Sequence, residues 1–395
     1  MHPNVPHLRF PEFHGEWEKC KLGDIAILTK GSGISKDQRS ATGTPCILYG
    51  ELYTTYKSEV IDYVVSKTDI SDKNLVRSCA NDIIIPSSGE TAIDISTARC
   101  VLSPDVLLGG DLNIIRLKDG DGRFFSYQLN GVRKYDIAKI AQGVSVVHLY
   151  GESIKGLTVS FPSNKEQQKI STLLSLIDER IATQSKLIED LKKLRSAISK
   201  LVFAQEPNGW SRLDTLLSKG KAGGTPTSTN KEYYNGEIPF LSINDMTKQG
   251  KYVRYTENHL SQSGLENSSA WVVPKYSLIM SMYASVGLVT INEIPTTTSQ
   301  AMFAMQLKDK GLLDYLYYYL LYFKSRYIYK YLETGTQSNI NADIVRGIMI
   351  PTYGHSRNME IASTLQGIDV KIDNELSVLK LFNRQKNYLL SQMFI

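Results

Sequence analysis

The stretch LLSLIDERI at residues 173–181 is matched later in the chain by TLQGIDVKI at residues 364–372. The two stretches lie 191 residues apart, and the coinciding positions are Ile170, Leu174, Ile177, Asp178 and Ile181 with Ile361, Leu365, Ile368, Asp369 and Ile372. Apolar residues that recur at helical spacing form one face of a helix. The chain is therefore expected to carry the same amphipathic helix twice.

The repeat extends upstream of both stretches, with small gaps. The paired landmarks are TPCILYGEL (44–52) with IPFLSINDM (238–246), DIIIPSS (82–88) with SLIMSMY (277–283), and Phe161-Pro162 with Ile350-Pro351. A proline after a strand-like run releases the chain into a helix. The pattern predicts an α+β fold: two domains of similar mixed fold, each followed by a long helix. The expected ranges are 1–160 and 206–350 for the domains, and 161–205 and 351–395 for the helices.

The helical segments predict an antiparallel coiled coil with pseudo-twofold symmetry, although two independent surface helices remain an alternative. Residues 164 to about 204 contain no proline or glycine, enough for a rod of roughly 60 Å. In one allowed register Arg195 faces Glu375 and Gln184 faces Lys386, all polar interruptions of an apolar seam. The seam residues are Ile170, Leu174, Ile177, Ile181, Ile188 and Leu191, then Ile361, Leu365, Ile368, Ile372, Leu379 and Phe382.

Composition restricts the function classes only mildly. The 45 basic and 40 acidic residues give a net charge of +5, which permits an anionic partner without establishing one. The four cysteines lack the spacing of ligand pairs, so no metal site is expected. The longest apolar run, at 313–323, is too short to span a bilayer, and no secretory signal is recognised. A cytoplasmic protein without a membrane partner is expected.

Motifs that carry catalysis are missing from the sequence. It contains no GxxxxGK[ST], HExxH or GxSxG pattern, and no GxGxxG opening a helix after a strand. The Asn-Pro-Pro-aromatic tetrapeptide of amino-methyltransferases is also missing. The sequence therefore predicts a chain that is not an enzyme and has no catalytic residue, cofactor or metal of its own.

Polar loops suit binding to nucleic acid, because Lys and Arg neutralise phosphates while Asn, Gln, Ser and Arg can read base edges. The candidates are Lys30, Ser32, Lys36 and Arg39 in the first half, and Lys221, Thr225, Thr227, Asn230, Lys231, Asn244, Gln337, Ser338, Asn339 and Asn341 in the second. For residues 335–341, a polar turn is an equal alternative. Gly223-Gly-Thr-Pro226 is read as a turn in preference to an anion loop, and the tyrosine-rich segment 315–331 as core in preference to a stacking platform.

Several segments together resemble the specificity (S) subunit of type I restriction–modification systems. They are Val5–Phe13 with Trp17 and Leu22-Gly-Asp24, Phe161-Pro162 with Glu166-Gln-Gln-Lys-Ile170, Ile177-Asp178, Gly223-Gly-Thr-Pro-Thr227, and Tyr233–Leu241. The resemblance covers nearly the whole chain, including its duplication. The second helix departs from it, because Pro351–Asn358 lacks the Glu-Gln-Gln run.

The resemblance implies a DNA sequence-recognition subunit whose two target-recognition domains each read one half of a bipartite, asymmetric double-stranded site. It also implies two modification (methyltransferase) subunits, docked on the helices, that methylate adenine with S-adenosylmethionine. Restriction (helicase-nuclease) subunits using ATP and Mg would complete the complex, in the cytoplasm of a bacterium or archaeon and associated with the nucleoid. A decoy or regulatory S subunit, and a coiled-coil adaptor that binds no DNA, are the alternatives.

Overall fold

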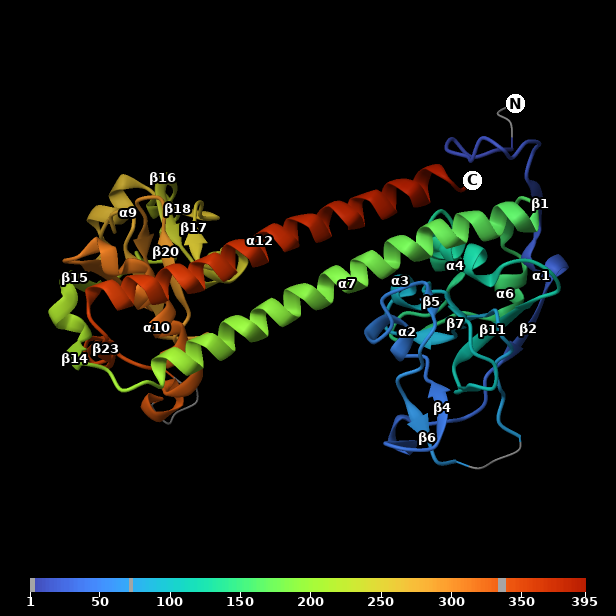
Figure 1. The fold of residues 1–395 in the computed structure, drawn as a ribbon. Coiled ribbons are helices and arrows are strands. Elements are labelled where there is room, and N and C mark those ends of the chain that lie inside the picture. Colours follow the sequence, from blue (N-terminus) through green and yellow to red (C-terminus); the bar gives the residue numbers. More distant parts are fainter. Residues whose placement is uncertain (1–3, 71–73, 333–338) are drawn as a thin grey trace. The chain divides into compact units, whose positions relative to one another are not determined.

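The computed structural model describes residues 4–70, 74–332 and 339–395, which form two compact units. Unit 1 comprises Met1–Lys186 with Leu376–Ile395, and unit 2 comprises Leu187–Glu375. Two long helices, α7 (Asn164–Phe203) and α12 (His355–Gln392), each contribute residues to both units (Figure 1).

A five-stranded sheet forms the centre of unit 1, in the order β2-β11-β7-β9-β5. Strand β7 reads DIIIP and is buried along its whole length, as expected for a continuous apolar run in the middle of a sheet. The strands are β2 (Ala26–Lys30), β5 (Val60–Ile61), β7 (Asp82–Pro86), β9 (Arg99–Val101) and β11 (Leu112–Leu117). Helix α4 (Gly122–Asn130) packs against β7 and β9, and Asp121 caps its first turn by accepting from the Arg123 amide at 2.9 Å.

The remaining elements of unit 1 form smaller sheets and short helices. A four-stranded sheet has the order β10-β4-β6-β3, and two further pairs are β1-β13 and β12-β8. The strands are β1 (Glu18–Lys21), β3 (Arg39–Ser40), β4 (Thr44–Ile47), β6 (Lys67–Thr68), β8 (Ser88–Gly89), β10 (Leu107–Leu108), β12 (Val147–His148) and β13 (Thr158–Phe161). The helices are α1 (Leu22–Ile25), η1 (Lys36–Gln38), α2 (Glu51–Thr54), α3 (Ala92–Ile95), α5 (Lys134–Ile140) and α6 (Gly151–Lys155).

Unit 2 repeats this architecture. Its five-stranded sheet, β15-β22-β19-β20-β17, has the same succession of chain segments, and β14 pairs with β23 as β1 does with β13. The strands are β14 (Gly209–Arg212), β15 (Leu217–Ala222), β16 (Tyr234–Leu241), β17 (Tyr252–Val253), β18 (Asn258–Leu260), β19 (Leu278–Ser281), β20 (Val289–Asn292), β21 (Thr297–Thr298), β22 (Met302–Leu307) and β23 (Met349–Thr352). The helices are η2 (Leu213–Leu216), η3 (Lys231–Tyr233), α8 (Ile243–Gln249), α9 (Gln262–Glu266), η4 (Lys310–Leu312), α10 (Leu313–Arg326), η5 (Ile328–Tyr331) and α11 (Ala342–Arg346).

The ends of the long helices are part of the cores of the two units. In unit 1, Ile170 and Leu174 of α7 join Trp17, Phe124 and Phe394 in one apolar cluster. The Trp17 and Phe124 rings meet edge to face with centroids 5.6 Å apart, a favourable aromatic geometry. The outer parts of the predicted seam therefore anchor each helix to the domain beside it.

Unit 2 anchors its share of the helices in the same way. Ile361 and Leu365 of α12 cluster with Phe203 of α7 and with Tyr315 and Tyr319 of α10. Among the seam residues of both units, Ile170, Leu174, Ile177, Ile188, Ile361, Leu365 and Ile372 are buried, and Ile181, Leu191, Ile368, Leu379 and Phe382 are half-buried. The segments of α7 and α12 run antiparallel within each unit, and the α+β fold class is confirmed.

The predicted register of the helix pair is wrong. In unit 2, Arg195 pairs with Asp369 at 2.5 Å, while Glu375, six residues further along, pairs with Lys371 on its own helix. In unit 1, Lys386 pairs with Asp178 at 2.6 Å instead of facing Gln184. The two acids that pair with these cations, Asp178 and Asp369, are the aspartates of the repeated stretches. Each also accepts a hydrogen bond from a tyrosine hydroxyl of its own unit.

Among the helices that the structure describes, none is long and apolar enough to cross a membrane.

Candidate nucleic-acid interface

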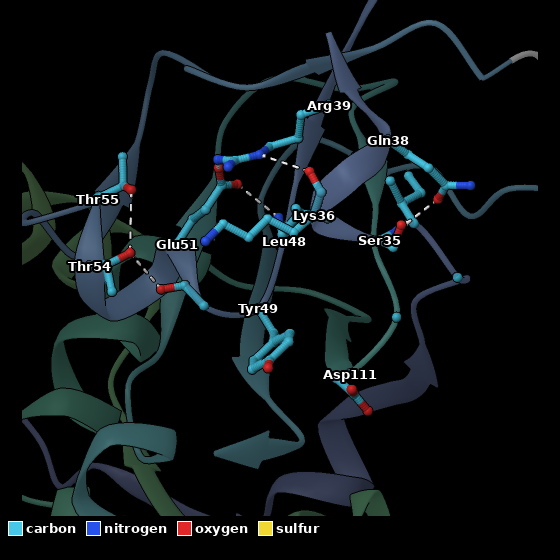
Figure 2. A pocket seen from close by; sticks show the side chains of 14 residues that line it. Ser35, Lys36, Gln38, Arg39, Leu48, Tyr49, Glu51, Thr54, Thr55 and Asp111 are labelled. Carbon is cyan, nitrogen blue, oxygen red and sulfur yellow. Dashed lines mark hydrogen bonds and ion pairs between the residues drawn. The ribbon is translucent and has the colours of Figure 1, made fainter. Parts of the chain in front are cut away.

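A cavity of about 1070 Å³ opens in unit 1 beside several of the predicted binding residues (Figure 2). Helices η1 and α2, the end of β4 and the turn at Gly110 form its wall. Its lining is Gly33, Ile34, Ser35, Lys36, Gln38, Arg39, Leu48, Tyr49, Gly50, Glu51, Thr54, Thr55, Gly110 and Asp111. A cavity with charged, amide, hydroxyl and aromatic side chains offers the groups that bind phosphates and base edges.

The local fold orients the cations of this cavity. Glu51 is buried and accepts hydrogen bonds from the Leu48 amide at 2.9 Å and from the Ser66 hydroxyl. The Arg39 guanidinium lies 3.5 Å from the Glu51 carboxylate, and its Nε donates to the Lys36 carbonyl at 3.3 Å. Figure 2 shows these side chains together at one side of the cavity. Arg39 is therefore held at the cavity wall while remaining 38% exposed.

The loop that follows β2, which leads to the cavity-lining residues from Gly33 onward, depends on a glycine at its start. A Cβ at Gly31 would lie 2.0 Å from the Gly109 carbonyl oxygen, so the two backbone segments can approach this closely only without a side chain. Ser32, predicted to bind, uses its hydroxyl to accept the Val76 amide at 2.7 Å, so it fixes the loop. Lys30 lies exposed at the end of β2.

The cysteine nearest in sequence to the cavity-lining residues, Cys46, is not a reactive thiol. Its side chain is buried, and burial raises its pKa to about 11, so the thiol is protonated at neutral pH. All four cysteines are free. Within the described part of the chain, no group of three or more His, Cys, Asp or Glu side chains is placed to hold a metal ion.

In unit 2 the predicted residues from 221 to 231 run from the end of β15, which contains Lys221, through the segment that follows it to the first residue of η3, Lys231. The amides of Gly223 and Gly224 donate to the carbonyls of Met302 and Thr298, at 3.2 and 2.9 Å. Both donors of a possible anion loop are thus used inside the fold, which favours the turn. A Cβ at Gly223 would lie 1.9 Å from the Thr298 carbonyl oxygen.

The polar side chains of this turn partly bond to one another. The Thr225 hydroxyl donates to the Gln300 amide oxygen at 2.5 Å, and Asn230 caps η3 by accepting from the Glu232 amide at 3.1 Å. The Lys221 ammonium donates to the Ser269 carbonyl at 3.4 Å. Lys231 and Thr227 are exposed, and Asn244 donates to Glu257 at 3.1 Å from the first turn of α8.

The second predicted loop lies only partly within the described residues. Gln337 and Ser338 fall outside them, and Asn339 is half-buried. Asn341 is the N-cap of α11, where its side-chain oxygen accepts from the amides of Asp343 and Ile344 at 3.0 and 2.9 Å. This contact gives Asn341 a structural role.

The tyrosines of α10 belong to the core. Tyr315, Tyr318, Tyr319 and Tyr322 are all buried, and the hydroxyls of Tyr315 and Tyr319 donate to the carbonyls of Pro351 and Met349. A stacking platform for bases needs exposed ring faces, so the core interpretation is the correct one.

Sequence reasoning missed several residues of the cavity. Glu51, Tyr49 and Asp111 line it, but they come from segments that read as strand ends and turns. Glu51 carried one usable signal: it stands three residues after Leu48, a spacing at which a carboxylate can accept a hydrogen bond from a nearby backbone amide.

In unit 2 the cation–π contact of Lys219 over Trp271, at 4.1 Å, has no sequence signal, because the two residues are brought together only by the fold.

A sequence profile described as "Type I restriction modification DNA specificity domain" matches residues 14–193 and 207–379, one copy in each half. Because these matches cover most of the chain, it belongs to the type I restriction–modification DNA specificity family. It is accordingly a specificity subunit, and not a catalytic one.

Similar proteins come from bacteria and archaea. The putative type I restriction enzyme MjaX specificity subunit of Methanocaldococcus jannaschii is 24% identical, over 94% of this chain and 91% of that protein. The HindI specificity subunit of Haemophilus influenzae is 32% identical, over 37% of this chain and 32% of that protein. The MjaIX specificity subunit of M. jannaschii is 27% identical, over 39% of this chain and 36% of that protein. The match thus spans about a third of the HindI and MjaIX subunits.

Solved structures support the fold. The type I restriction–modification S subunit from M. genitalium has a TM-score of 0.62 at 18% identity, covering 99% of both chains. A chain from a study of complex assembly and conformational transition of the type I system has a TM-score of 0.59 at 16% identity, covering 96% of this chain and 97% of that one.

Proposed function

We propose that each unit reads one half of a bipartite, asymmetric site in double-stranded DNA. The observation that carries this proposal is a shared framework with dissimilar loops. The five-stranded sheets have the same order, yet unit 1 presents a cavity with Lys36 and Arg39, and unit 2 presents the segment from 221 to 231. A shared framework gives two readers of the same kind, and different loops give two different half-sites.

The chemistry of the loops suits this role. Lys36, Arg39, Lys221 and Lys231 supply positive charge for phosphates, which fix the protein on the duplex without reading its sequence. Gln38 and Thr227 can form hydrogen bonds with base edges, which differ from one base pair to the next in the major groove. Glu51, buried behind Arg39, limits the directions in which that guanidinium can point.

We further assign the chemistry of the complex to partner chains. Two modification subunits would dock on the paired helices and methylate adenine with S-adenosylmethionine, and restriction subunits would supply ATP- and Mg-dependent cleavage. The names of the similar proteins, which are specificity subunits of type I restriction enzymes, support this division of labour. DNA as the ligand places the complex at the nucleoid, in the cytoplasm of a bacterium or archaeon.

Binding measured against salt tests the proposal. The chain, assembled with its modification subunits, is titrated with a duplex carrying the motif methylated in its host and with a duplex of scrambled half-sites. Phosphate contacts require the affinity to fall steeply as salt rises, and sequence reading requires the first duplex to bind more tightly at every salt concentration. Equal affinity for the two duplexes would reject the proposal. No binding to either would favour an adaptor that contacts proteins alone.

A further inference from the structure

Unit 1 contains a buried group of three side chains that joins the domain to both long helices. The Tyr127 hydroxyl, from α4, donates to Asp178 Oδ2 of α7 at 2.8 Å. Lys386 Nζ, from α12, lies 2.6 Å from Asp178 Oδ1. The Lys386 side chain is 12% exposed and that of Asp178 is 8% exposed. We call Tyr127, Asp178 and Lys386 the unit 1 triad.

Unit 2 contains the same arrangement, here called the unit 2 triad: Tyr318, Asp369 and Arg195. The Tyr318 hydroxyl, from α10, donates to Asp369 Oδ2 of α12 at 2.7 Å, and Arg195 Nη1 of α7 lies 2.5 Å from Asp369 Oδ1. Corresponding members of the two triads are separated by the repeat length of 191 residues. The tyrosine and the cation even approach corresponding oxygens of the two aspartates.

Each triad connects one turn of α7 to one turn of α12. Asp178 and Arg195 stand 17 residues apart on α7, and Asp369 and Lys386 stand 17 residues apart on α12. The two triads therefore specify the same antiparallel register independently.

The apolar seam by itself would tolerate a slip, because its residues repeat every heptad. The triads do not tolerate one. The residues seven positions from Lys386 are Leu379 and Met393, and those seven positions from Arg195 are Ile188 and Val202. A slip by a heptad in either direction would set an apolar side chain against Asp178, which is buried, or against Asp369, which is 14% exposed. A largely buried charge that loses its partner is destabilising.

From this geometry we propose that the two triads fix the helix register, and with it the number of base pairs between the two half-sites. Tyr127, Asp178, Lys386, Tyr318, Asp369 and Arg195 are then positioning residues for DNA spacing, and they contact no DNA. This inference rests on the proposed reading of one half-site by each unit. It assigns the choice of spacer length to six polar side chains as well as to helix length.

The test uses the complex with its modification subunits and maps adenine methylation across a genome. The variant is Lys386→Met with Arg195→Met, which removes both cations. The matched control is Lys386→Arg with Arg195→Lys, which keeps both charges. Lys193→Met is a second control, because Lys193 is exposed on α7 and pairs with Glu189 of the same helix.

We expect the Met variant to methylate the same half-sites at more than one spacer length, while both controls keep the single wild-type spacer. A single unchanged spacer in the Met variant would overturn the proposal. If that variant does not assemble, Tyr127→Phe with Tyr318→Phe takes its place, since it keeps the charges and the ring packing. Loss of the single spacer would then support the proposal, and its retention would refute it. Failure of the proposed function looks different, because the wild-type complex would then show no bipartite motif.

Discussion

At the scale of single residues, the two triads differ in their surroundings although their members match. Lys386 contacts two buried carboxylates, those of Asp178 and Glu59. The position equivalent to Glu59 in unit 2 is Lys251, which donates to the Tyr318 hydroxyl at 3.1 Å and pairs with Asp314 at 2.7 Å. Unit 1 thus has an extra acid where unit 2 has an extra base. Lys386 therefore neutralises two carboxylates, whereas Arg195 pairs with one.

Replacing Lys386 by Met is therefore expected to cost more stability than replacing Arg195 by Met. Breaking a buried pair costs about 3–5 kcal/mol, and the lysine variant would leave two carboxylates without their cation. The Arg195 side chain is 34% exposed, so water replaces part of its contact. Urea unfolding of the two variants measures the difference. Equal losses would show that Glu59 adds nothing to the charge balance, and Lys386→Arg is the control.

Glu59 gives unit 1 a pH dependence of known sign. Burial raises the pKa of Glu59, Lys386 opposes that rise, and Asp178 adds to it. A carboxyl group with a raised pKa in the folded state stabilises the fold fully below its unfolded pKa of about 4.3, and this contribution is lost as pH rises through the folded value.

Because of this sign, Glu59→Gln should gain stability relative to the wild type as pH rises above about 4.3, the ordinary pKa of Glu. Melting temperatures measured from acid to neutral pH give the comparison. Glu152→Gln is the control, since the Glu152 side chain is 84% exposed. Parallel profiles for Glu59→Gln and the wild type would contradict the expectation.

Arg39 is the residue whose loss should report most directly on DNA contact in unit 1. Arg39→Ala is expected to weaken binding of the bipartite duplex and to reduce the slope of log affinity against log salt by about one phosphate contact. Lys139→Ala is the control, because that side chain is 78% exposed on α5, away from the cavity lining. Fluorescence anisotropy over a salt series measures both quantities. A slope like that of the wild type would remove Arg39 from the interface.

At the scale of secondary-structure elements, the sequence predicts the two long helices and their antiparallel orientation correctly and their register wrongly. The heptad pattern identifies the seam, since apolar spacing is local information. The register depends on Tyr127 and Tyr318, which are far from the helices in the sequence and reach the aspartates only after folding. The predicted pairing of Arg195 with Glu375 rests on the polar interruptions of the two seams and on the twofold symmetry of the repeat. In the structure Arg195 pairs instead with Asp369, whose carboxylate also accepts a hydrogen bond from the Tyr318 hydroxyl.

The same contrast applies to the candidate site. Loops rich in Lys, Ser and Asn can be recognised in the sequence. Lys36 and Arg39, which line the cavity, are predicted as binding residues in this way. Whether a polar side chain faces solvent or supports a turn is decided by the backbone around it. Ser32, Asn230 and Asn341 are the examples, since each bonds to a backbone amide of its own domain.

Inserting one heptad into each helix between the triads tests the role of the helices as a spacer. Both triads can still form, and each helix gains about 10.5 Å, close to three base pairs of duplex. The half-sites are expected to stay the same while the preferred spacer lengthens by about that amount. Methylation mapping of the modified complex reads both properties. Altered half-sites with an unchanged spacer would contradict the role, and a heptad in one helix alone should disrupt assembly.

At the scale of the whole molecule, duplication explains why one chain can read an asymmetric site. The sheet order, the helix ends and the triads are common to both units. The loops around the unit 1 cavity and the turn after β15 are not. A repeated framework conserves how each domain is held, and divergence of its loops changes what each domain binds.

The most direct test of this function is to map adenine methylation in cells that carry the modification subunits, with and without the gene for this chain. We predict one bipartite motif with two different half-sites and a fixed spacer, present with the gene and lost without it. An identical methylation pattern in both strains would contradict the role of this chain in DNA sequence recognition.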